Sequence, residues 1–187
     1  MDEAIFTLAE RDFGVTQHWH KRIVRAGPNT VTTFGDMPEI RTIGQNDTVY
    51  VDLGPVFEAW EADVGRTYAL GDDADRRRLV ADLPRVWERV QAHYRGNRDI
   101  TGADLYAFAQ AAAIQAGWVF GGHIAGHTVG EFSHLTWPGE RNEQLIWPGN
   151  PLPLNRSDHL GRERHWILEI HLVDAGRTFG GFYEQLL

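Results

Sequence analysis

Three acidic side chains lie inside segments that otherwise have the pattern of β-strands, and this feature constrains the fold more than any other. Asp52 lies in VYVDLG, Glu169 in WILEIHLV and Glu184 in GGFYEQLL. Because side chains alternate along a strand, Glu169 and His171 share one face and their apolar neighbours share the other. A carboxylate buried without compensation is costly, so each acid must lie at a solvated edge, pair with a partner or bind a metal ion.

A fourth acid and two histidines belong with these three. Asp63 precedes Gly65 and the strand-like segment RTYAL, so we expect it to enter the same sheet from the next strand. His127 and His134 lie in GHIAGHTVGEFSH, where glycines let the backbone approach a ligand closely. Taken singly, each acid could instead form a salt bridge at a strand edge, and each histidine could be an ordinary loop residue whose ring nitrogens are hydrogen-bonded. Several such acids together favour a metal site.

Composition limits which ligands and partners are available. The chain contains no cysteine, so a metal ion must be held by imidazole and carboxylate groups, which favours harder ions. A net charge of −8 without a Lys/Arg block argues against nucleic acid or a membrane surface as partner. The N-terminus carries charges where a secretory signal needs an apolar run, and no segment approaches the roughly 20 apolar residues of a membrane span. We therefore expect a cytoplasmic protein that acts on a small or peptidic substrate.

The 187 residues fit one domain of mixed helices and strands, so the expected class is α+β. An N-terminal helix is already under way at the first residues, which predicts a truncated start. Residues 136–164 contain two Trp-Pro-Gly triplets and predict an irregular surface loop that could roof a site. The other expected elements are strands over 19–24 and 48–53, helices over 75–95 and 102–116, and a hairpin with strands over 166–173 and 178–184.

These segments together resemble the M24 metallopeptidases, the pita-bread family that includes methionine aminopeptidase, aminopeptidase P, prolidase and creatinase. VDLGPVFEAWEADVGRTYALG is similar to the family stretch with two metal-binding aspartates, here Asp52 and, eleven positions later, Asp63. GHTVGEFSH resembles the family segment with a ligand histidine, here His127, and a substrate-binding histidine seven positions later. Two glutamates end the family's ligand set. The resemblance covers about residues 15–187 and implies one pita-bread catalytic domain over 1–187, with a curved, mainly antiparallel sheet, helices on its outer face and no separate N-terminal domain.

The resemblance also implies a dinuclear site and its chemistry. Asp52 would bind one divalent ion, His127 and Glu169 would bind the other, and Asp63 and Glu184 would bridge both. The ions, manganese, iron, cobalt or zinc, would activate a bridging water as hydroxide for cleavage of an amide or peptide C–N bond. The implied catalytic residues are Glu169 as general acid/base and His134 as hydrogen-bond donor to the substrate carbonyl. The expected enzyme is of the aminopeptidase or Xaa-Pro dipeptidase type and acts on a small peptide or amide. Its oligomeric state stays open, with a homodimer as one candidate.

Two departures from the family pattern concern substrate binding. In the prolidase branch a histidine follows a segment like AGPNT, whereas this chain continues TVTTFGD. His18 and His20, expected on one face of the preceding strand, are candidates for the missing substrate-binding role. His171 is a candidate sixth ligand, partner of a ligand or substrate contact, because it shares the strand face of Glu169. Two alternatives stay open: a non-peptidase metalloenzyme acting on a small metabolite, creatinase-like or biosynthetic, and a non-catalytic peptide-binding module.

Overall fold

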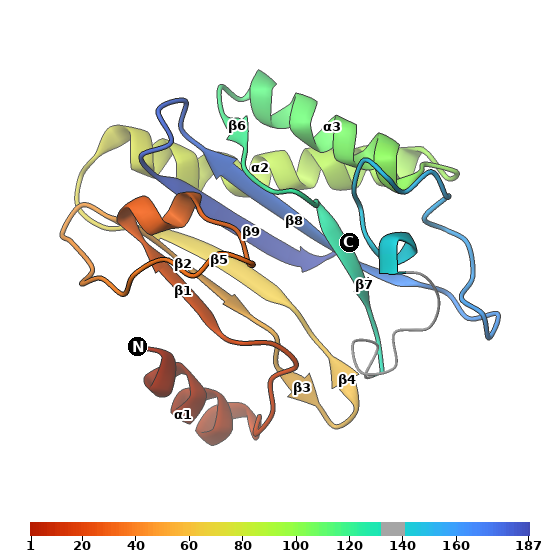
Figure 1. Ribbon diagram of the computed structural model, residues 1–187, viewed down its shortest axis with the longest axis horizontal. Coiled ribbons are helices and arrows are strands. Elements are labelled where there is room, and N and C mark those ends of the chain that lie inside the picture. Colours follow the sequence, from red (N-terminus) through yellow and green to blue (C-terminus); the bar gives the residue numbers. More distant parts are fainter. Residues whose placement is uncertain (132–140) are drawn as a thin grey trace.

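The computed structural model describes residues 1–131 and 141–187, which form a twisted sheet with the helices of residues 74–115 on one side (Figure 1). The strands of this sheet are β1 (Ile23–Ala26), β2 (Thr48–Leu53), β5 (Val64–Ala69), β6 (Val119–Phe120), β7 (Gly126–Val129), β8 (His165–Val173) and β9 (Gly180–Leu186). Their order is β1-β2-β5-β9-β8-β6, and β7 also pairs with β8. The short strands β3 (Val56–Phe57) and β4 (Trp60–Glu61) form a separate pair. All of these pairs are antiparallel.

Two helices, α2 (Ala74–Gly96) and α3 (Gly102–Gln115), confirm the two long helices expected from the sequence. The side chain of Asp73 caps α2 by accepting a hydrogen bond from the Arg76 N–H, and Thr101 caps α3 in the same way through Asp104. One face of α2 buries an apolar stripe at helical spacing: Leu79, Leu83, Val86, Trp87 and Val90. This stripe packs α2 against β8 and β9.

The two faces of β8 have different roles. Leu168, Ile170 and Leu172 are fully buried and join the hydrophobic core beneath the helices. The Trp87 indole N–H donates to the Leu168 carbonyl oxygen at 2.9 Å, which ties α2 to this strand. Glu169 and His171 lie on the other face, where a cavity opens. The expected alternation along β8 and the expected α+β class with a mainly antiparallel sheet are therefore confirmed.

The expected strand over 19–24 is wrong in its position. β1 begins only at Ile23, and Trp19 and His20 belong to a bend before it. The Trp19 backbone N–H donates to the Gly54 carbonyl oxygen at 3.0 Å, and its indole N–H donates to the Ala62 carbonyl oxygen at 2.9 Å. These two bonds hold the bend across the end of β2, so it cannot continue the ladder of β1.

Three further regions complete the described chain. Helix α1 (Asp2–Phe13) has no buried residue, and Gly27–Val31 forms a 3-10 helix where a turn was expected. The expected surface loop contains a 3-10 helix, Arg141–Gln144, and its described part is more than a surface excursion because Ile146 and Leu154 are buried in the core. Within residues 1–131 and 141–187, no helix combines the length and apolarity needed to cross a bilayer.

Candidate metal centre

The register of the sheet brings four carboxylates to one face. Asp52 on β2 pairs with Gly65 on β5, Gly65 pairs with Glu184 on β9, and Glu184 pairs with Glu169 on β8. Directly opposed residues in antiparallel strands share a face, so three acids form a row across the sheet. Asp63 lies two residues before Gly65 and projects to the same face. The row lies on the face opposite the helices.

The glycine before His127 sets the approach of β7 to this row. Gly126 has a φ of 141°, a conformation that side chains other than glycine rarely adopt, and a Cβ there would overlap the Ile167 carbonyl oxygen. Within β7, His127 is buried, and its Nδ1 lies 2.9 Å from the Thr128 carbonyl oxygen. Its Nε2 therefore points towards the acids.

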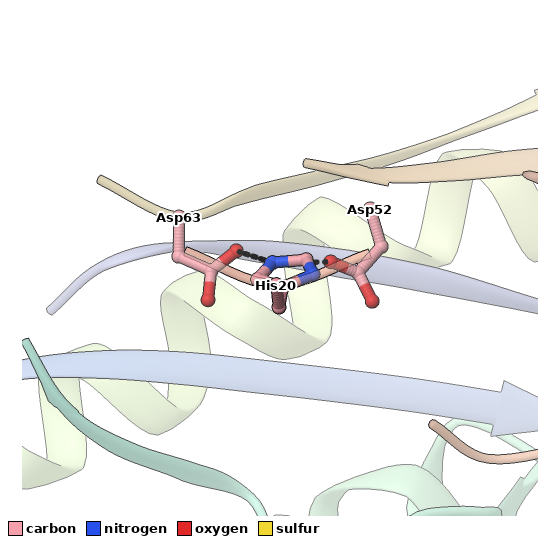
Figure 2. A group of neighbouring side chains, drawn as sticks. All are labelled: His20, Asp52 and Asp63. Carbon is pink, nitrogen blue, oxygen red and sulfur yellow. Dashed lines mark hydrogen bonds and ion pairs between the residues drawn. The ribbon is translucent and has the colours of Figure 1, made fainter. Parts of the chain in front are cut away.

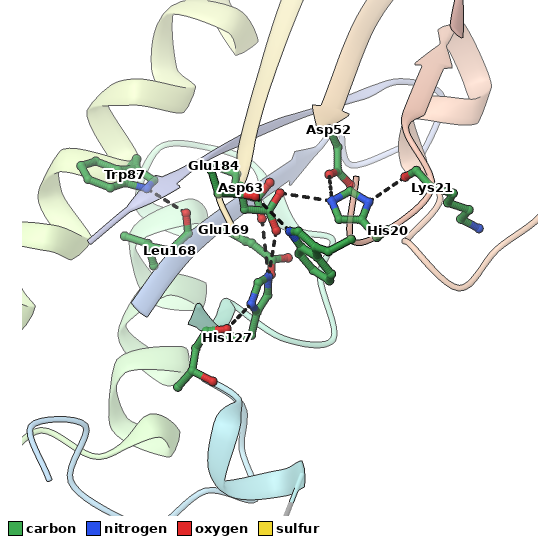
Figure 3. A network of polar contacts seen from close by, with 12 residues as sticks. His20, Lys21, Asp52, Asp63, Trp87, His127, Leu168, Glu169 and Glu184 are labelled. Carbon is green, nitrogen blue, oxygen red and sulfur yellow. Dashed lines mark hydrogen bonds and ion pairs between the residues drawn. The ribbon is translucent and has the colours of Figure 1, made fainter. Parts of the chain in front are cut away.

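Three carboxylates surround Nε2 of His127 (Figure 3). This atom lies 3.2 Å from Oδ2 of Asp63, 3.6 Å from Oε1 of Glu169 and 4.0 Å from Oε1 of Glu184. The arrangement brings together side chains from β7, β8, β9 and the residue that precedes β5.

A second imidazole lies at the other end of the row. Figure 2 shows His20 between two aspartates, with its Nε2 3.3 Å from Oδ1 of Asp63 and 3.4 Å from Oδ1 of Asp52. Its Nδ1 lies 2.6 Å from the Lys21 carbonyl oxygen. The side chain of His20 is only 5% exposed, so the bend before β1 delivers this imidazole into the site.

Asp63 is the residue that the two ends have in common. Potential ligand atoms of His20, Asp52 and Asp63 lie within 4.8 Å of one another, and the same holds for Asp63, His127 and Glu184. The Oδ1 atom of Asp63 faces His20 and its Oδ2 atom faces His127. A carboxylate that divides its oxygens in this way is suited to bridging two cations.

The site holds more acidic groups than its two imidazoles can neutralise. Burial raises the pKa of Asp52 to about 7 and that of Glu169 to about 7, and it raises the pKa of Glu184 well above its usual value. Burial would also raise the pKa of Asp63, but hydrogen bonds with His127 and His20 lower it. Burial opposes the positive charge of His127, yet contact with Asp63 and Glu169 raises the pKa of that imidazole to about 9.

The donor set fits divalent metal ions. Oε2 of Glu184 is buried and, within the described part of the chain, has no hydrogen-bond partner. A buried carboxylate oxygen of this kind needs a proton donor or a cation. Carboxylate oxygens with imidazole nitrogens and no thiolate are ligands that manganese, iron, cobalt and zinc accept.

A cavity of about 300 Å³ lies over the site. The six residues described above line it, together with aromatic side chains that the sequence reasoning had not singled out: Trp19, Phe34, Tyr50 and Phe182. For two of them, strand alternation could have predicted a position in the site, since Tyr50 lies two residues before Asp52 and Phe182 two residues before Glu184 and each shares the face of that acid.

The other candidate histidines do not face the acids as His20 and His127 do, or lie outside the described residues. His171 lines the cavity, but its Nε2 contacts the Thr30 carbonyl oxygen at 2.8 Å, and burial lowers the pKa of this imidazole to about 4. His18 and His20 do not share a strand face as expected: the ring of His18 lies 6.0 Å from that of Phe6 in α1, outside the described cavity lining. His134 lies outside the described residues.

Comparison with known proteins gives one family match and three similar proteins. A family profile described as "Metallopeptidase family M24" matches residues 1–154. An Xaa-Pro dipeptidase of Lactobacillus delbrueckii subsp. lactis is 29% identical over 122 residues, which are 65% of this chain but only 33% of that protein. The X-Pro aminopeptidase of Thermotoga maritima superposes with a TM-score of 0.73 at 21% identity over 98% of this chain and 49% of that chain. Methionine aminopeptidase of Thermotoga maritima superposes with a TM-score of 0.73 at 16% identity over 98% of this chain and 78% of that chain.

Proposed function

Because this chain belongs to metallopeptidase family M24 and has its pita-bread fold, we propose that it is a dinuclear metal-dependent hydrolase that cleaves an amide or peptide C–N bond in a small peptide. The observation that carries the proposal is the position of Asp63, whose two carboxylate oxygens face two separate groups of buried ligand atoms. This chain spans about half of the X-Pro aminopeptidase and a third of the dipeptidase, so the activity of those longer proteins is proposed for it and not transferred to it.

The proposed ligands divide between two cations. Asp52 would hold one ion, and His127 and Glu169 would hold the other, while Asp63 and Glu184 would contribute to both. The chemistry that such cations would supply is Lewis-acid activation of water, which would make a nucleophile available near pH 7. The buried and unpartnered Oε2 of Glu184 supports this assignment, since within the described residues it lacks any other group to satisfy it.

Glu169 is the proposed general acid/base. In the metal-free protein, burial raises the pKa of Glu169 to about 7, so this carboxyl group takes up and releases a proton near neutral pH. Its carboxyl group lies at the cavity wall, beside His127, where it can hold a proton and pass it to the leaving nitrogen. We propose His134 as the hydrogen-bond donor to the substrate carbonyl, as the family resemblance implies.

The cavity supports a small substrate. Its volume of about 300 Å³ lies at the lower end of the range for ligand pockets, and Trp19, Phe34 and Phe182 provide apolar wall. Two of the similar proteins are named for action next to proline, as Xaa-Pro dipeptidase and X-Pro aminopeptidase. We therefore propose Xaa-Pro peptides as the first substrates to test, because the aromatic wall suits the apolar ring of proline.

Metal analysis and peptide hydrolysis test the proposal together. Protein purified without chelator should contain about two transition-metal ions per chain. The Asp63→Asn variant should lose both ions and all turnover of Xaa-Pro dipeptides followed by mass spectrometry. Asp75→Asn, at an exposed position of α2, is the matched control and should lose neither.

The outcomes separate the metal site from the chemistry. Absence of bound metal under metal-replete conditions would refute the dinuclear centre. A protein that binds two ions yet leaves a broad peptide panel intact would refute peptide hydrolysis and favour a small-metabolite substrate. Peptide binding that survives both chelation and Asp63→Asn would favour a non-catalytic module.

A further inference from the structure

His20 lies at the cation position of Asp52, where the ligand set implied by the family resemblance has no imidazole. Its Nε2 is 3.3 Å from Oδ1 of Asp63 and 3.4 Å from Oδ1 of Asp52 (Figure 2). The three side chains are 5%, 2% and 11% exposed, so solvent screens their interaction little. The imidazole nitrogen and the two carboxylate oxygens therefore converge on one buried point.

The hydrogen bond of Nδ1 determines whether Nε2 of His20 presents a proton or a lone pair to Asp52 and Asp63. Nδ1 of His20 lies 2.6 Å from the carbonyl oxygen of the next residue, Lys21. A carbonyl oxygen only accepts, so Nδ1 carries the proton, and in the neutral ring Nε2 presents its lone pair to the carboxylates. A lone pair facing two carboxylate oxygens is stable only with a proton or a cation between them.

His127 repeats this arrangement at the other end of the site. Its Nδ1 lies 2.9 Å from the carbonyl oxygen of the next residue, Thr128, and its Nε2 faces Asp63. Metal-binding histidines commonly donate the second ring N–H to a backbone carbonyl, which fixes the tautomer that coordinates. The two imidazoles are thus oriented alike on opposite oxygens of the same aspartate (Figure 3).

The surrounding backbone holds the His20 ring in place. The Trp19 N–H donates to the Gly54 carbonyl oxygen at 3.0 Å, and the Trp19 indole N–H donates to the Ala62 carbonyl oxygen at 2.9 Å. A Cβ at Gly54 would overlap the His20 ring, so the glycine leaves the space that the imidazole fills. The segment before β1 is therefore bonded to the backbone two residues after Asp52 and one residue before Asp63.

We propose that Nε2 of His20 is a sixth protein ligand, bound to the cation that Asp52 and Asp63 hold. This inference rests on the proposed dinuclear function. Each of the two cations then has one imidazole ligand, and His20 is not a replacement for the substrate-binding histidine of the prolidase branch. A nitrogen ligand at this position favours iron, cobalt and zinc relative to manganese.

Cobalt(II) bound to the full chain tests the proposal by proton NMR. An imidazole bound to paramagnetic cobalt through Nε2 keeps its Nδ1 proton, which gives a strongly shifted signal that disappears in D₂O. The wild-type protein should show two such signals, from His20 and His127, because both Nδ1 protons bond to backbone carbonyl oxygens. His20→Gln should remove one signal and weaken the binding of one of the two cobalt ions by about tenfold or more.

His18→Gln is the matched control, since this histidine lies two residues earlier and outside the described cavity lining. It should retain both signals and both affinities, and His20→Asn serves as a second variant should His20→Gln fold poorly. Two bound cobalt ions with every shifted N–H signal unaffected in the His20 variants would overturn the inference and leave the proposed function standing. Failure of the wild-type chain to bind cobalt would overturn both.

Discussion

Replacing Glu169 with Gln should stabilise the metal-free protein at alkaline pH, although it removes a proposed ligand. Gln has nearly the same shape as Glu but carries no charge. Glu169 lies half-buried on the site face of β8 beside the buried acids, and desolvation raises the pKa of its carboxyl group from 4.5 to about 7. The folded protein therefore binds this proton more tightly than the unfolded chain does.

The sign and size of the effect follow from that difference in pKa. Between pH 4.5 and pH 7 the folded state retains a proton that the unfolded state releases, so the free energy of unfolding falls as the pH rises. Each unit of pKa difference is worth about 1.4 kcal/mol, so ionised Glu169 costs the folded state about 3 kcal/mol above pH 7. Attraction to protonated His127 is already part of this pKa.

Urea unfolding of chelator-treated protein, followed by tryptophan fluorescence, measures the effect at two pH values. At pH 8, Glu169→Gln should raise the free energy of unfolding by about 3 kcal/mol, or the melting temperature by roughly 6–12 °C for a chain of this size. At pH 4.5 the two proteins should differ little because Glu169 is then protonated when folded. Glu88→Gln, at an exposed position on α2, should change little at either pH.

Equal destabilisation of Glu169→Gln at both pH values would contradict the raised pKa of Glu169, because it would mean that protein groups alone compensate its carboxylate. A gain at pH 8 that persists after saturation with metal would refute the proposed role of Glu169 as a ligand.

Two other predictions concern the same site. Adding manganese or cobalt to the chelator-treated protein at pH 8 should raise the free energy of unfolding by about 2.7 kcal/mol for each bound ion when the free ion exceeds its Kd a hundredfold. A melting temperature that metal leaves unchanged would contradict a folded metal site. Gly65→Ala places a Cβ 2.5 Å from the Phe182 ring and 3.0 Å from Cβ of Glu184, so calorimetry should show the free energy of unfolding reduced by about 1–3 kcal/mol, and metal binding should weaken. Gly96→Ala is the control, because the added Cβ would meet no atom within 4 Å beyond its chain neighbours and its own helix backbone.

The sequence predicts the parts of this molecule that depend on local periodicity. The helical spacing from Leu79 to Val90 and the capping pattern at Thr101 predict α2 and α3 because both signals arise within a few turns. The alternation around Glu169 predicts which face of β8 carries the acid. These features depend on neighbours in the chain, and the structure confirms them.

The position of His20 could not be predicted in the same way. Alternation treats residues 18–20 as a strand, but long-range hydrogen bonds from Trp19 to the carbonyl oxygens of Gly54 and Ala62 turn the segment across β2. That turn separates His18 from His20 and brings only His20 to the acids. Similarly, nothing local shows that Asp63 lies between two imidazoles, because the partners come from segments before β1 and from β7.

The acids of β8 and β9 also bear on how the hairpin folds. The turn between these strands is tied by Asp174, which accepts hydrogen bonds from the N–H groups of Thr178 and Phe179. Sliding one strand by a single residue would move Glu169 or Glu184 to the helix face, among side chains such as Leu168 and Ile170 that have no exposed surface. A hairpin misaligned by one residue would therefore bury a charge in the core, so the residues proposed for metal binding also favour the observed alignment of β8 and β9.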